Sequence, residues 1–461
     1  LAQRAPMGPI LHPNDQSRVL WLDPPDDFWQ DGAAARRSER VPDTTHPGRG
    51  ERNIMSMEFA RFAARSVRPS AALVALAMAG QAASAQFLPL GVLSDRTPDP
   101  GSFGVGLTPD GNTAVGHSNV DFDDGVGGVL SYANAFRWTR SGGTLFNLGV
   151  PEGGLGGSSA ARVSGDGSVV VGTTGFSLSG QYEARNGTIW TDAASNAPVA
   201  QLVAEAYTVQ DVSRDGRFVA GTTRVPGDPF PTPNLAYIWE HGAGPLRELG
   251  TLPGGSYSVG HAISGAGDVV VGTGDAGVGF VNAWRWTEPT GMQMLAGLPA
   301  DRASEAFDIS ADGRTIVGQS GGELYRWSET GGAEILGKLP GAAFLTSSID
   351  VRADGNMIVG TFMDDFFELK PFVWTPEFGM VTLEQFIAGA GLDTLGYIPL
   401  SATAVSDDGL TIAGVALSPR GMFEAYVLTV PSPGSAMPAL GVIGIAGVRR
   451  RRPAHGAGRI A

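Results

Sequence analysis

A nine-residue pattern of polar turn residues followed by apolar residues recurs seven times along the chain. In each copy a pair such as Asp-Gly precedes a short, mostly β-branched run that ends at glycine. Asp can bond to its own backbone and Gly tolerates a positive φ, so the pair predicts a tight turn and the run predicts a strand. The copies are TPDGNTAVG (108–116), SGDGSVVVG (164–172), SRDGRFVAG (213–221), SGAGDVVVG (264–272), SADGRTIVG (310–318), RADGNMIVG (352–360) and SDDGLTIAG (406–414).

Three further strand patterns accompany each copy. A stretch of small residues, such as 258–264, precedes the turn. An aromatic or β-branched stretch follows, and a short apolar stretch, such as 245–250, comes after it. The aromatic stretch carries Trp138, Trp190, Trp239, Trp286, Trp327 and Trp374 in six copies and Leu428 in the seventh. We expect these side chains to pack between neighbouring units rather than to bind a ligand.

Seven copies of a four-strand unit predict an all-β fold, a seven-bladed β-propeller. The copies start 42–56 residues apart, too far for a parallel solenoid coil, and a β-sandwich would not repeat. Hairpin turns such as 288–291 pair each short apolar strand with the Trp strand before it. The first such strand, 87–93, is then left over, and we expect it to pair with 424–430 and to close the ring. The propeller domain is predicted to span 86–430.

Alternating strand direction places the connections on two faces. The turn face carries the turns of the nine-residue pattern and the turns after the Trp strands, all expected to be tight. The variable-loop face carries the other connections, which differ in length, and binding sites usually occupy such loops. The connections before the Trp strands are 117–133, 173–185, 222–234, 273–281, 319–322, 361–369 and 415–423.

Two of these predicted loops supply candidate binding residues. The first contains Asp121, Asp123 and Asp124, and the second contains Asp364, Asp365, Phe366 and Phe367. Oxygen ligands at the alternate positions Asn119, Asp121 and Asp123 suit calcium, the only cofactor candidate. A solvated acidic loop is the alternative, because the glycine comes one position late for an EF-hand. The phenylalanines could contact sugars if exposed, or lie under the blade edge.

Charge and motif content narrow the function. Residues 86–433 contain 17 Lys and Arg against 37 Asp and Glu, so 17 − 37 = −20, and such a body would be repelled by nucleic acid. There is no cysteine, and His117, His241 and His261 lack metal-binding spacing. The sequence shows no G-x-S-x-G elbow and no P-loop, and we expect no carboxylate to recur as a repeat-derived catalytic site would require.

The repeats resemble a known family. The run LGTLPGGSYSVGHAIS (249–264), DVVVG (268–272) and NAWRWTEPTGMQMLAGLP (282–299) is similar to the bacterial extracellular HAF repeat family. The resemblance covers about residues 87–430. Its usual His-Ala-Phe is replaced here by residues 134–136 and 282–284. The family has no settled function, so the resemblance implies an extracellular location without an activity.

The N-terminal part reads as a disordered stretch followed by a secretory signal peptide. Residues 1–54 are rich in Arg, Asp and Pro and are predicted to be disordered, or to lie upstream of a true start at Met55 or Met57. Within 55–85, three arginines, the apolar run 71–80 and the Ala83-x-Ala85 site describe a signal peptide. We expect signal peptidase to cut after Ala85. A core helix is the alternative.

The C-terminal part, 431–461, resembles a PEP-CTERM sorting tail. Pro431 and Pro433 precede an apolar run, 436–448, and then a basic stop formed by Arg449, Arg450, Arg451 and Arg452. The resemblance implies processing by an exosortase-type protease, although Ser432 stands where Glu is typical. The 13-residue run would form a helix of about 20 Å, shorter than a bilayer core of roughly 30 Å, and the arginines would stay cytoplasmic. A short hydrophobic helix with transient membrane contact is predicted, and an unstructured apolar tail is the alternative.

These observations predict an exported repeat protein of the cell surface or extracellular matrix of a Gram-negative-type bacterium. We expect it to be non-catalytic and to bind polysaccharide or another surface protein through the variable-loop face. The alternative is an extracellular propeller enzyme that acts on glycans with carboxylates near the ring centre.

Overall fold

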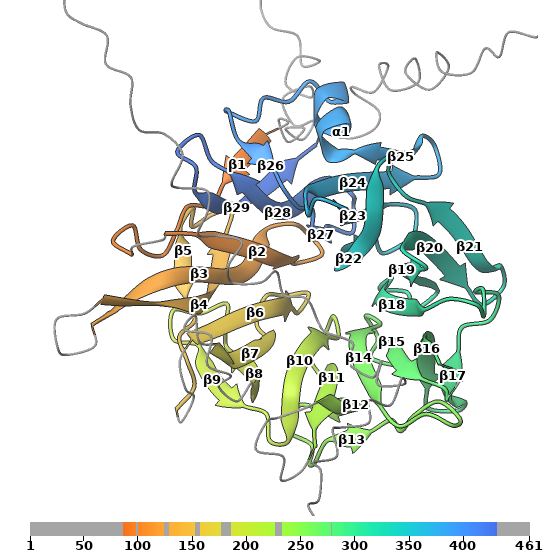
Figure 1. The fold of residues 1–461 in the computed structure, drawn as a ribbon. Coiled ribbons are helices and arrows are strands. Elements are labelled where there is room, and N and C mark those ends of the chain that lie inside the picture. Colours follow the sequence, from red (N-terminus) through yellow and green to blue (C-terminus); the bar gives the residue numbers. More distant parts are fainter. Residues whose placement is uncertain are drawn as a thin grey trace, which may run out of the picture. The chain divides into compact units, whose positions relative to one another are not determined.

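The computed structural model describes residues 86–97, 100–123, 129–152, 157–176, 186–225, 233–277 and 279–430, all within one compact unit. These residues form seven antiparallel sheets arranged around a ring (Figure 1). The prediction of an all-β, seven-bladed propeller is confirmed. In the six blades built from four consecutive strands the first strand lies nearest the ring axis and the last lies outermost, whereas in the seventh blade the strand 86–89 lies at the outer edge (Figure 1).

Six blades contain four consecutive strands. Blade 1 has β2 (Ser102–Leu107), β3 (Thr113–Asp123), β4 (Val129–Thr139) and β5 (Leu145–Asn147); blade 2 has β6 (Gly157–Val163), β7 (Val170–Phe176), β8 (Asn186–Thr191) and β9 (Val199–Leu202); blade 3 has β10 (Ala206–Val212), β11 (Phe218–Arg224), β12 (Pro233–Glu240) and β13 (Arg247–Glu248). Blade 4 has β14 (Ser258–Ile263), β15 (Val269–Asp275), β16 (Val281–Thr287) and β17 (Gly291–Met294); blade 5 has β18 (Ser304–Ile309), β19 (Thr315–Ser320), β20 (Glu323–Ser328) and β21 (Gly332–Gly337); blade 6 has β22 (Ala342–Val351), β23 (Ile358–Asp364), β24 (Leu369–Thr375) and β25 (Gly379–Thr382).

Blade 7 joins the two ends of the propeller. It contains β26 (Ile398–Pro399), β27 (Ala404–Val405), β28 (Thr411–Leu417), β29 (Phe423–Thr429) and, from the start of the described chain, β1 (Gln86–Pro89). β1 pairs antiparallel with β29, with Gln86 opposite Thr429 and Pro89 opposite Tyr426. The predicted closure is confirmed, although the strand ends at Pro89 because Gly91, at a φ of +78°, turns the chain. Gln86 and Val430 both leave the ring on the turn face.

Six of the seven turns share one hydrogen-bond arrangement, centred on the Ser or Thr hydroxyl that begins the turn. The sixth copy begins instead with Arg352, whose Nε donates to the Asp354 carboxylate at 2.7 Å. In blade 2, Ser164 Oγ donates to the Asp166 carboxylate at 2.8 Å and accepts from the backbone N–H of Val169 at 3.0 Å. The turn glycine adopts a positive φ in all seven copies, at Gly111, Gly167, Gly216, Gly267, Gly313, Gly355 and Gly409. In the fourth copy, which lacks the usual Asp, Asp268 accepts from Ser264 Oγ at 2.6 Å. The turn role predicted for this pattern is confirmed.

The Trp strands join each blade to the next. Trp138 and Trp190 are almost fully buried, and Trp327 Nε1 donates to the Ala296 carbonyl, 31 residues earlier, at 3.0 Å. In three successive pairs of blades an arginine lies over the tryptophan of the following blade. The distances from the guanidinium carbon to the ring centre are 5.2 Å for Arg247 over Trp286, 5.6 Å for Arg285 over Trp327 and 5.1 Å for Arg326 over Trp374. The predicted packing between units is confirmed.

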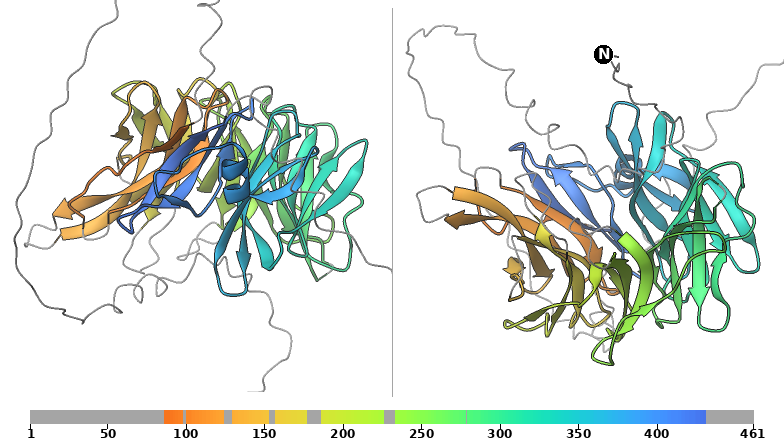
Figure 2. Two further views of the ribbon diagram at one scale, coloured as in Figure 1. Left: turned by 90° about the horizontal axis from the view of Figure 1, so that it is seen from above. Right: turned by 60° about the horizontal axis from the view of Figure 1, so that its bottom comes forward.

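Three details of the predicted connections are wrong. Most of the expected loop 117–133 is strand, because β3 runs to Asp123 and β4 starts at Val129, and this long hairpin projects from the ring (Figure 2). The two strands stay paired over this whole segment, for example with Asp121 opposite Ser131. The turns after the Trp strands are also not uniformly tight, since residues 192–198 separate β8 from β9.

The third detail is a helix, α1 (Leu383–Gly389), in the connection from blade 6 to blade 7. Thr382 caps it, with its hydroxyl accepting from the Gln385 N–H and the Gln385 side chain accepting from the Thr382 N–H. Phe386 and Ile387 bury its inner face against blade 7. Among the described residues no helix is long and apolar enough to cross a membrane.

Candidate functional site

One structurally equivalent position in the first strand of every blade lies near the ring axis. We call it the ring position; it stands two residues before the residue that begins each turn. In blades 1 to 5 the pairing between the first and second strands shifts by one residue directly before the ring position. Such a bulge changes the direction of the side chain that follows it. The seven residues at the ring position are Gly106, Arg162, Asp211, Ala262, Asp308, Asp350 and Ala404. Four charged side chains are therefore directed toward the centre of the propeller.

The three ring carboxylates connect first strands of neighbouring blades. Asp211 Oδ2 accepts from the Ile263 N–H of blade 4 at 2.8 Å. Asp308 Oδ2 accepts from the Val351 N–H of blade 6 at 2.8 Å. Asp350 Oδ2 accepts from Val405, in blade 7, at 2.6 Å. Each carboxylate thus satisfies a backbone donor of the next blade.

Burial and mutual proximity alter the ionisation of this group. Burial raises the pKa of Asp211 to about 6, although the charge of Arg162 opposes the rise. Burial and the neighbouring Asp350 carboxylate raise the pKa of Asp308 well above its ordinary value, and burial raises the pKa of Asp350. The Asp308 and Asp350 side chains bond to each other, so the pair holds a proton between them. Arg162 keeps its charge, because the three carboxylates outweigh its burial and raise its pKa.

Sequence reasoning missed this ring, and the expectation that no carboxylate recurs is wrong. The signal is present in the segments QDVS, FDIS and IDVR, where Asp211, Asp308 and Asp350 occupy the same place relative to the turn. It was obscured because the other four units have Gly, Arg or Ala there. Aligning the strands before the turns, rather than the turns alone, reveals it.

Main-chain hydrogen bonds join the turns around the axis on the turn face. The Gly165 N–H donates to the Arg214 carbonyl at 2.8 Å, the Arg214 N–H donates to the Gly265 carbonyl at 3.0 Å, and the Gly265 N–H donates to the Ala311 carbonyl at 3.0 Å. The Arg214 side chain also pairs with Asp407 of blade 7. These contacts tie the turns of several blades together on the turn face.

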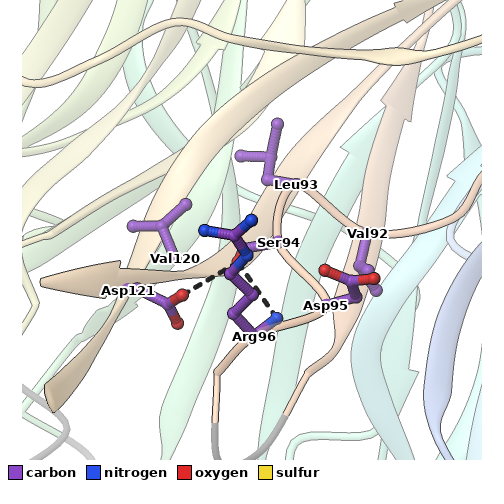
Figure 3. Close-up of a pocket in the computed structure, with 7 residues that line it drawn as sticks. All are labelled: Val92, Leu93, Ser94, Asp95, Arg96, Val120 and Asp121. Atoms are coloured by element: carbon purple, nitrogen blue, oxygen red, sulfur yellow. Dashed lines mark hydrogen bonds between the residues drawn. The ribbon is translucent and has the colours of Figure 1, made fainter.

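On the variable-loop face, Asp121 borders a wide, shallow depression beside blade 1. Its walls are Val92, Leu93, Ser94, Asp95, Arg96, Val120 and Asp121 (Figure 3). Ser94 Oγ donates to Asp121 Oδ2 at 3.2 Å, and the Asp121 side chain is exposed. This depression brings one predicted binding residue next to an arginine and a second carboxylate.

The calcium candidate is not assembled by the described residues. Asn119 is buried and Asp121 is exposed, and both lie in β3 rather than in a loop. The backbone of Asp123 ends β3, and Asp124 lies outside the described residues. No group of three or more acidic or histidine side chains in the described part of the chain could hold a metal ion. Calcium binding therefore stays a prediction.

The turn between β23 and β24 presents the second set of predicted residues. The Asp364 carboxylate accepts from the N–H groups of Phe366 and Glu368, both at 2.9 Å, and pairs with Lys370 at 3.1 Å. The backbone donors and the lysine lower the pKa of Asp364. Asp364 thus shapes the turn, while Asp365 is exposed and Phe366 and Phe367 are 83% and 53% exposed. Of the three phenylalanines in the segment 362–370, Phe366 and Phe367 are therefore exposed, whereas Phe362 is buried in the blade.

The remaining predicted residues are processing sites. They lie outside the described residues: Ala83, Ala85, Pro431, Pro433 and the arginines 449–452.

Burial alters the pKa of two of the three histidines of the repeat domain. It lowers the pKa of His117 and His261 to about 4, so both are neutral at physiological pH.

The chain resembles solved β-propeller structures only at low sequence identity. No family model and no curated protein matches the chain. An oligogalacturonate lyase in complex with manganese is similar over 75% of this chain and 96% of its own, with 14% identity and a TM-score of 0.47. An oligogalacturonate lyase from Vibrio parahaemolyticus is similar over 75% and 97%, with 13% identity and a TM-score of 0.47. TolB from Acinetobacter baumannii is similar over 70% and 82%, with 12% identity and a TM-score of 0.38. Similarity at this level carries no argument about activity.

Proposed function

We propose that this protein is an exported, non-catalytic binding protein of the cell surface or extracellular matrix of a Gram-negative-type bacterium. The observation that carries the proposal is the difference between its two faces. The turn face is tied together by main-chain hydrogen bonds around the axis. The variable-loop face instead exposes Phe366 and Phe367 and the depression beside Asp121. Polysaccharide or another surface protein would bind there.

The proposed route to the surface comes from the sequence. Signal peptidase would cut after Ala85, and an exosortase-type protease would process the tail near Pro431 and Pro433 after transient membrane contact. The HAF-repeat resemblance supports the same location. The acidic body, at −20 over residues 86–433, makes nucleic acid an unsuitable partner.

The alternative is a propeller enzyme that acts on glycans. The Asp308 and Asp350 pair favours it, since a shared proton in a buried site suits acid–base chemistry. Its geometry weighs against a glycosidase: the two carboxyl groups bond directly to each other, whereas glycosidases hold theirs about 5 Å or more apart. Both carboxylates are also occupied by backbone donors.

The test is to screen the secreted protein against glycan arrays, surface proteins of the producing cells and chromogenic glycosides. We expect saturable binding without turnover, weakened by serine at Phe366 and Phe367. Turnover of any glycoside that disappears in Asp308→Asn would instead support the enzyme. If substitutions on the variable-loop face leave all binding unchanged, the proposed face is wrong.

A further inference from the structure

Exposed apolar side chains gather at one end of blades 6 and 7. Of the eleven large apolar side chains that are exposed in the described part of the chain, six lie there. They are Phe344, Phe366, Phe367 and Leu369 in blade 6, and Leu395 and Ile398 in blade 7. We call these six residues the apolar tips. Single exposed apolar residues are ordinary, but a group on neighbouring blades marks an interaction site.

Strand register places the apolar tips on the variable-loop face. Phe344 pairs with Met363 near the end of β23, and Leu369 pairs with the same residue from β24. In blade 7, Ile398 pairs with Leu417, the last residue of β28. The ends of β23 and β28 both lie on the variable-loop face, so the two groups are presented to the same side.

The backbone holds these side chains away from the core. Phe367 and Leu395 have φ values of +63° and +56°, a region that bulky side chains rarely adopt. In both blades an aspartate fixes the local turn: Asp364 accepts from the Phe366 N–H at 2.9 Å, and Asp393 accepts from the Leu395 N–H at 2.8 Å. The side chains are thus displayed from ordered turns, which reduces the entropy that binding must overcome.

The charges around the apolar tips are mixed, because exposed Lys338 donates to the Ala343 carbonyl beside Phe344 and exposed Arg420 lies near Tyr397 beside Ile398, but the blade 6 turn itself is acidic. Asp365 and Glu368 are exposed within the blade 6 turn, and Asp393 lies two residues before Leu395. Lys370 is paired with Asp364 and so contributes little positive charge. A partner that contacts Phe366 and Phe367 must therefore also approach the exposed carboxylates of the blade 6 turn.

Net charge and side-chain type favour one of the partner classes that the proposed function allows. A second copy, an acidic polysaccharide and an anionic bilayer would all be repelled by a body of charge −20. Leu395 and Ile398 have no aromatic face to stack on a sugar ring. Apolar anchors with a charged rim are instead typical of protein–protein interfaces. We propose, resting on the variable-loop face as the binding side, that the apolar tips dock a protein partner through an apolar pocket rimmed by Lys and Arg.

The test uses the full chain and a peptide that alternates leucine and lysine as the probe for such a partner. Phe366→Ser with Phe367→Ser should weaken peptide binding about tenfold or more, as expected for anchor residues. The matched control is Val199→Ser with Leu202→Ser, which removes two exposed apolar side chains from β9 at the outer edge and should leave binding unchanged. A peptide of alternating serine and lysine should bind weakly to all variants. Phe366→Ala provides a second variant, and thermal unfolding checks that each protein is folded.

Equal binding of the leucine–lysine peptide by the tip variant and the control variant would overturn the proposal. So would binding to neutral glycans or to phosphatidylglycerol vesicles that is lost only in the tip variant, because the partner class would then be wrong. If the tip variant keeps its binding while Asp121→Ala, in blade 1 on the same face, loses it, the apolar tips are wrong and the proposed function stands. If neither variant affects any binding, the proposed function fails as well.

Discussion

At the scale of the residue, the ring carboxylates set how stability depends on pH. Asp211, Asp308 and Asp350 have raised pKa values in the folded protein, with Asp211 at about 6. Between the ordinary pKa of an aspartate and these values the folded state binds more protons than the unfolded state. These three carboxylates therefore contribute a fall in the free energy of unfolding as the pH rises through this window. His117 and His261, whose pKa values burial lowers to about 4, contribute a rise over the same window, because there the unfolded state binds their protons and the folded state does not.

We predict that Asp211 alone contributes a fall of about 2 kcal/mol in the free energy of unfolding as the pH rises from about 4.5 to about 7, against the opposite contribution of His117 and His261. Asp211→Asn should remove that part of the loss, because an amide oxygen can still accept from the Ile263 N–H without becoming charged. Urea unfolding at several pH values measures the effect. The exposed Asp365→Asn is the control, and an identical pH slope in Asp211→Asn and in the parent would contradict the prediction.

A second residue-scale prediction concerns the turns around the axis. A Cβ atom at Gly265 would lie 2.8 Å from the Ala311 carbonyl oxygen, a backbone atom that cannot move without shifting blade 5. We expect Gly265→Ala to destabilise the fold by about 1–3 kcal/mol. Gly101→Ala is the control, since its nearest neighbours are at 3.4 Å or more. Thermal unfolding compares the two, and equal melting temperatures would show that the turns are not tightly joined.

At the scale of the element, ring closure depends on one short strand. β1 covers the edge of β29, and Phe87 of this strand is buried and stacks on Tyr426 at 4.9 Å. Removing residues 86–89 would expose the backbone donors and acceptors of β29, and unpaired edges aggregate.

We therefore predict that deleting residues 86–89 lowers the melting temperature and causes aggregation, measured by calorimetry and light scattering. The control is a chain that begins at Gln86, which keeps β1 and should melt like the full chain. A deletion variant as stable and as soluble as this control would show that closure of the ring does not need β1.

The element scale also shows what the sequence could predict. The seven turns and the Trp strands follow from local patterns, because turn chemistry and alternation act within a few residues. The pairing of strand 87–93 with 424–430 follows instead from the repeat count, which leaves the first strand without a blade of its own. The projecting β3–β4 hairpin was missed because Asp121 and Asp123 look like loop residues, although strand pairing tolerates them at an exposed edge. α1 is short, and its cap at Thr382 was the only strong local signal.

The candidate site was harder to predict for a physical reason. The residues at the ring position interact only because blades far apart in sequence meet at the axis, as blade 2 with Arg162 and blade 6 with Asp350 do. The exposure of Phe366 and Phe367 likewise depends on the buried pairing of Asp364 with Lys370, which the sequence alone does not distinguish from a solvated acidic turn.

At the scale of the whole molecule, export and sorting can be tested together. Replacing Arg449 to Arg452 by glutamine should weaken the cytoplasmic stop, because each charge resists crossing the bilayer by about 3 kcal/mol, and unprocessed protein should be released early. Changing Pro431 and Pro433 should instead keep the uncut form in the membrane fraction. Cell fractionation and the mass of the C-terminus distinguish the two outcomes, and N-terminal sequencing should start at Gln86. Release and trimming of both variants like the parent would contradict the sorting hypothesis.

The exit of Gln86 and Val430 on the same face of the ring has a consequence for presentation. Only residues 431–435 separate Val430 from the apolar run that starts at Ala436, and an extended chain of this length reaches about 20 Å at most. If the tail is held in a bilayer, as proposed, the turn face must therefore stay close to the lipid and the variable-loop face must point outward. A propeller tethered in this way would expose its binding face to the medium and could bind partners before the tail is cut. Cutting the tail would release the protein to diffuse, and it would leave the binding surface unchanged.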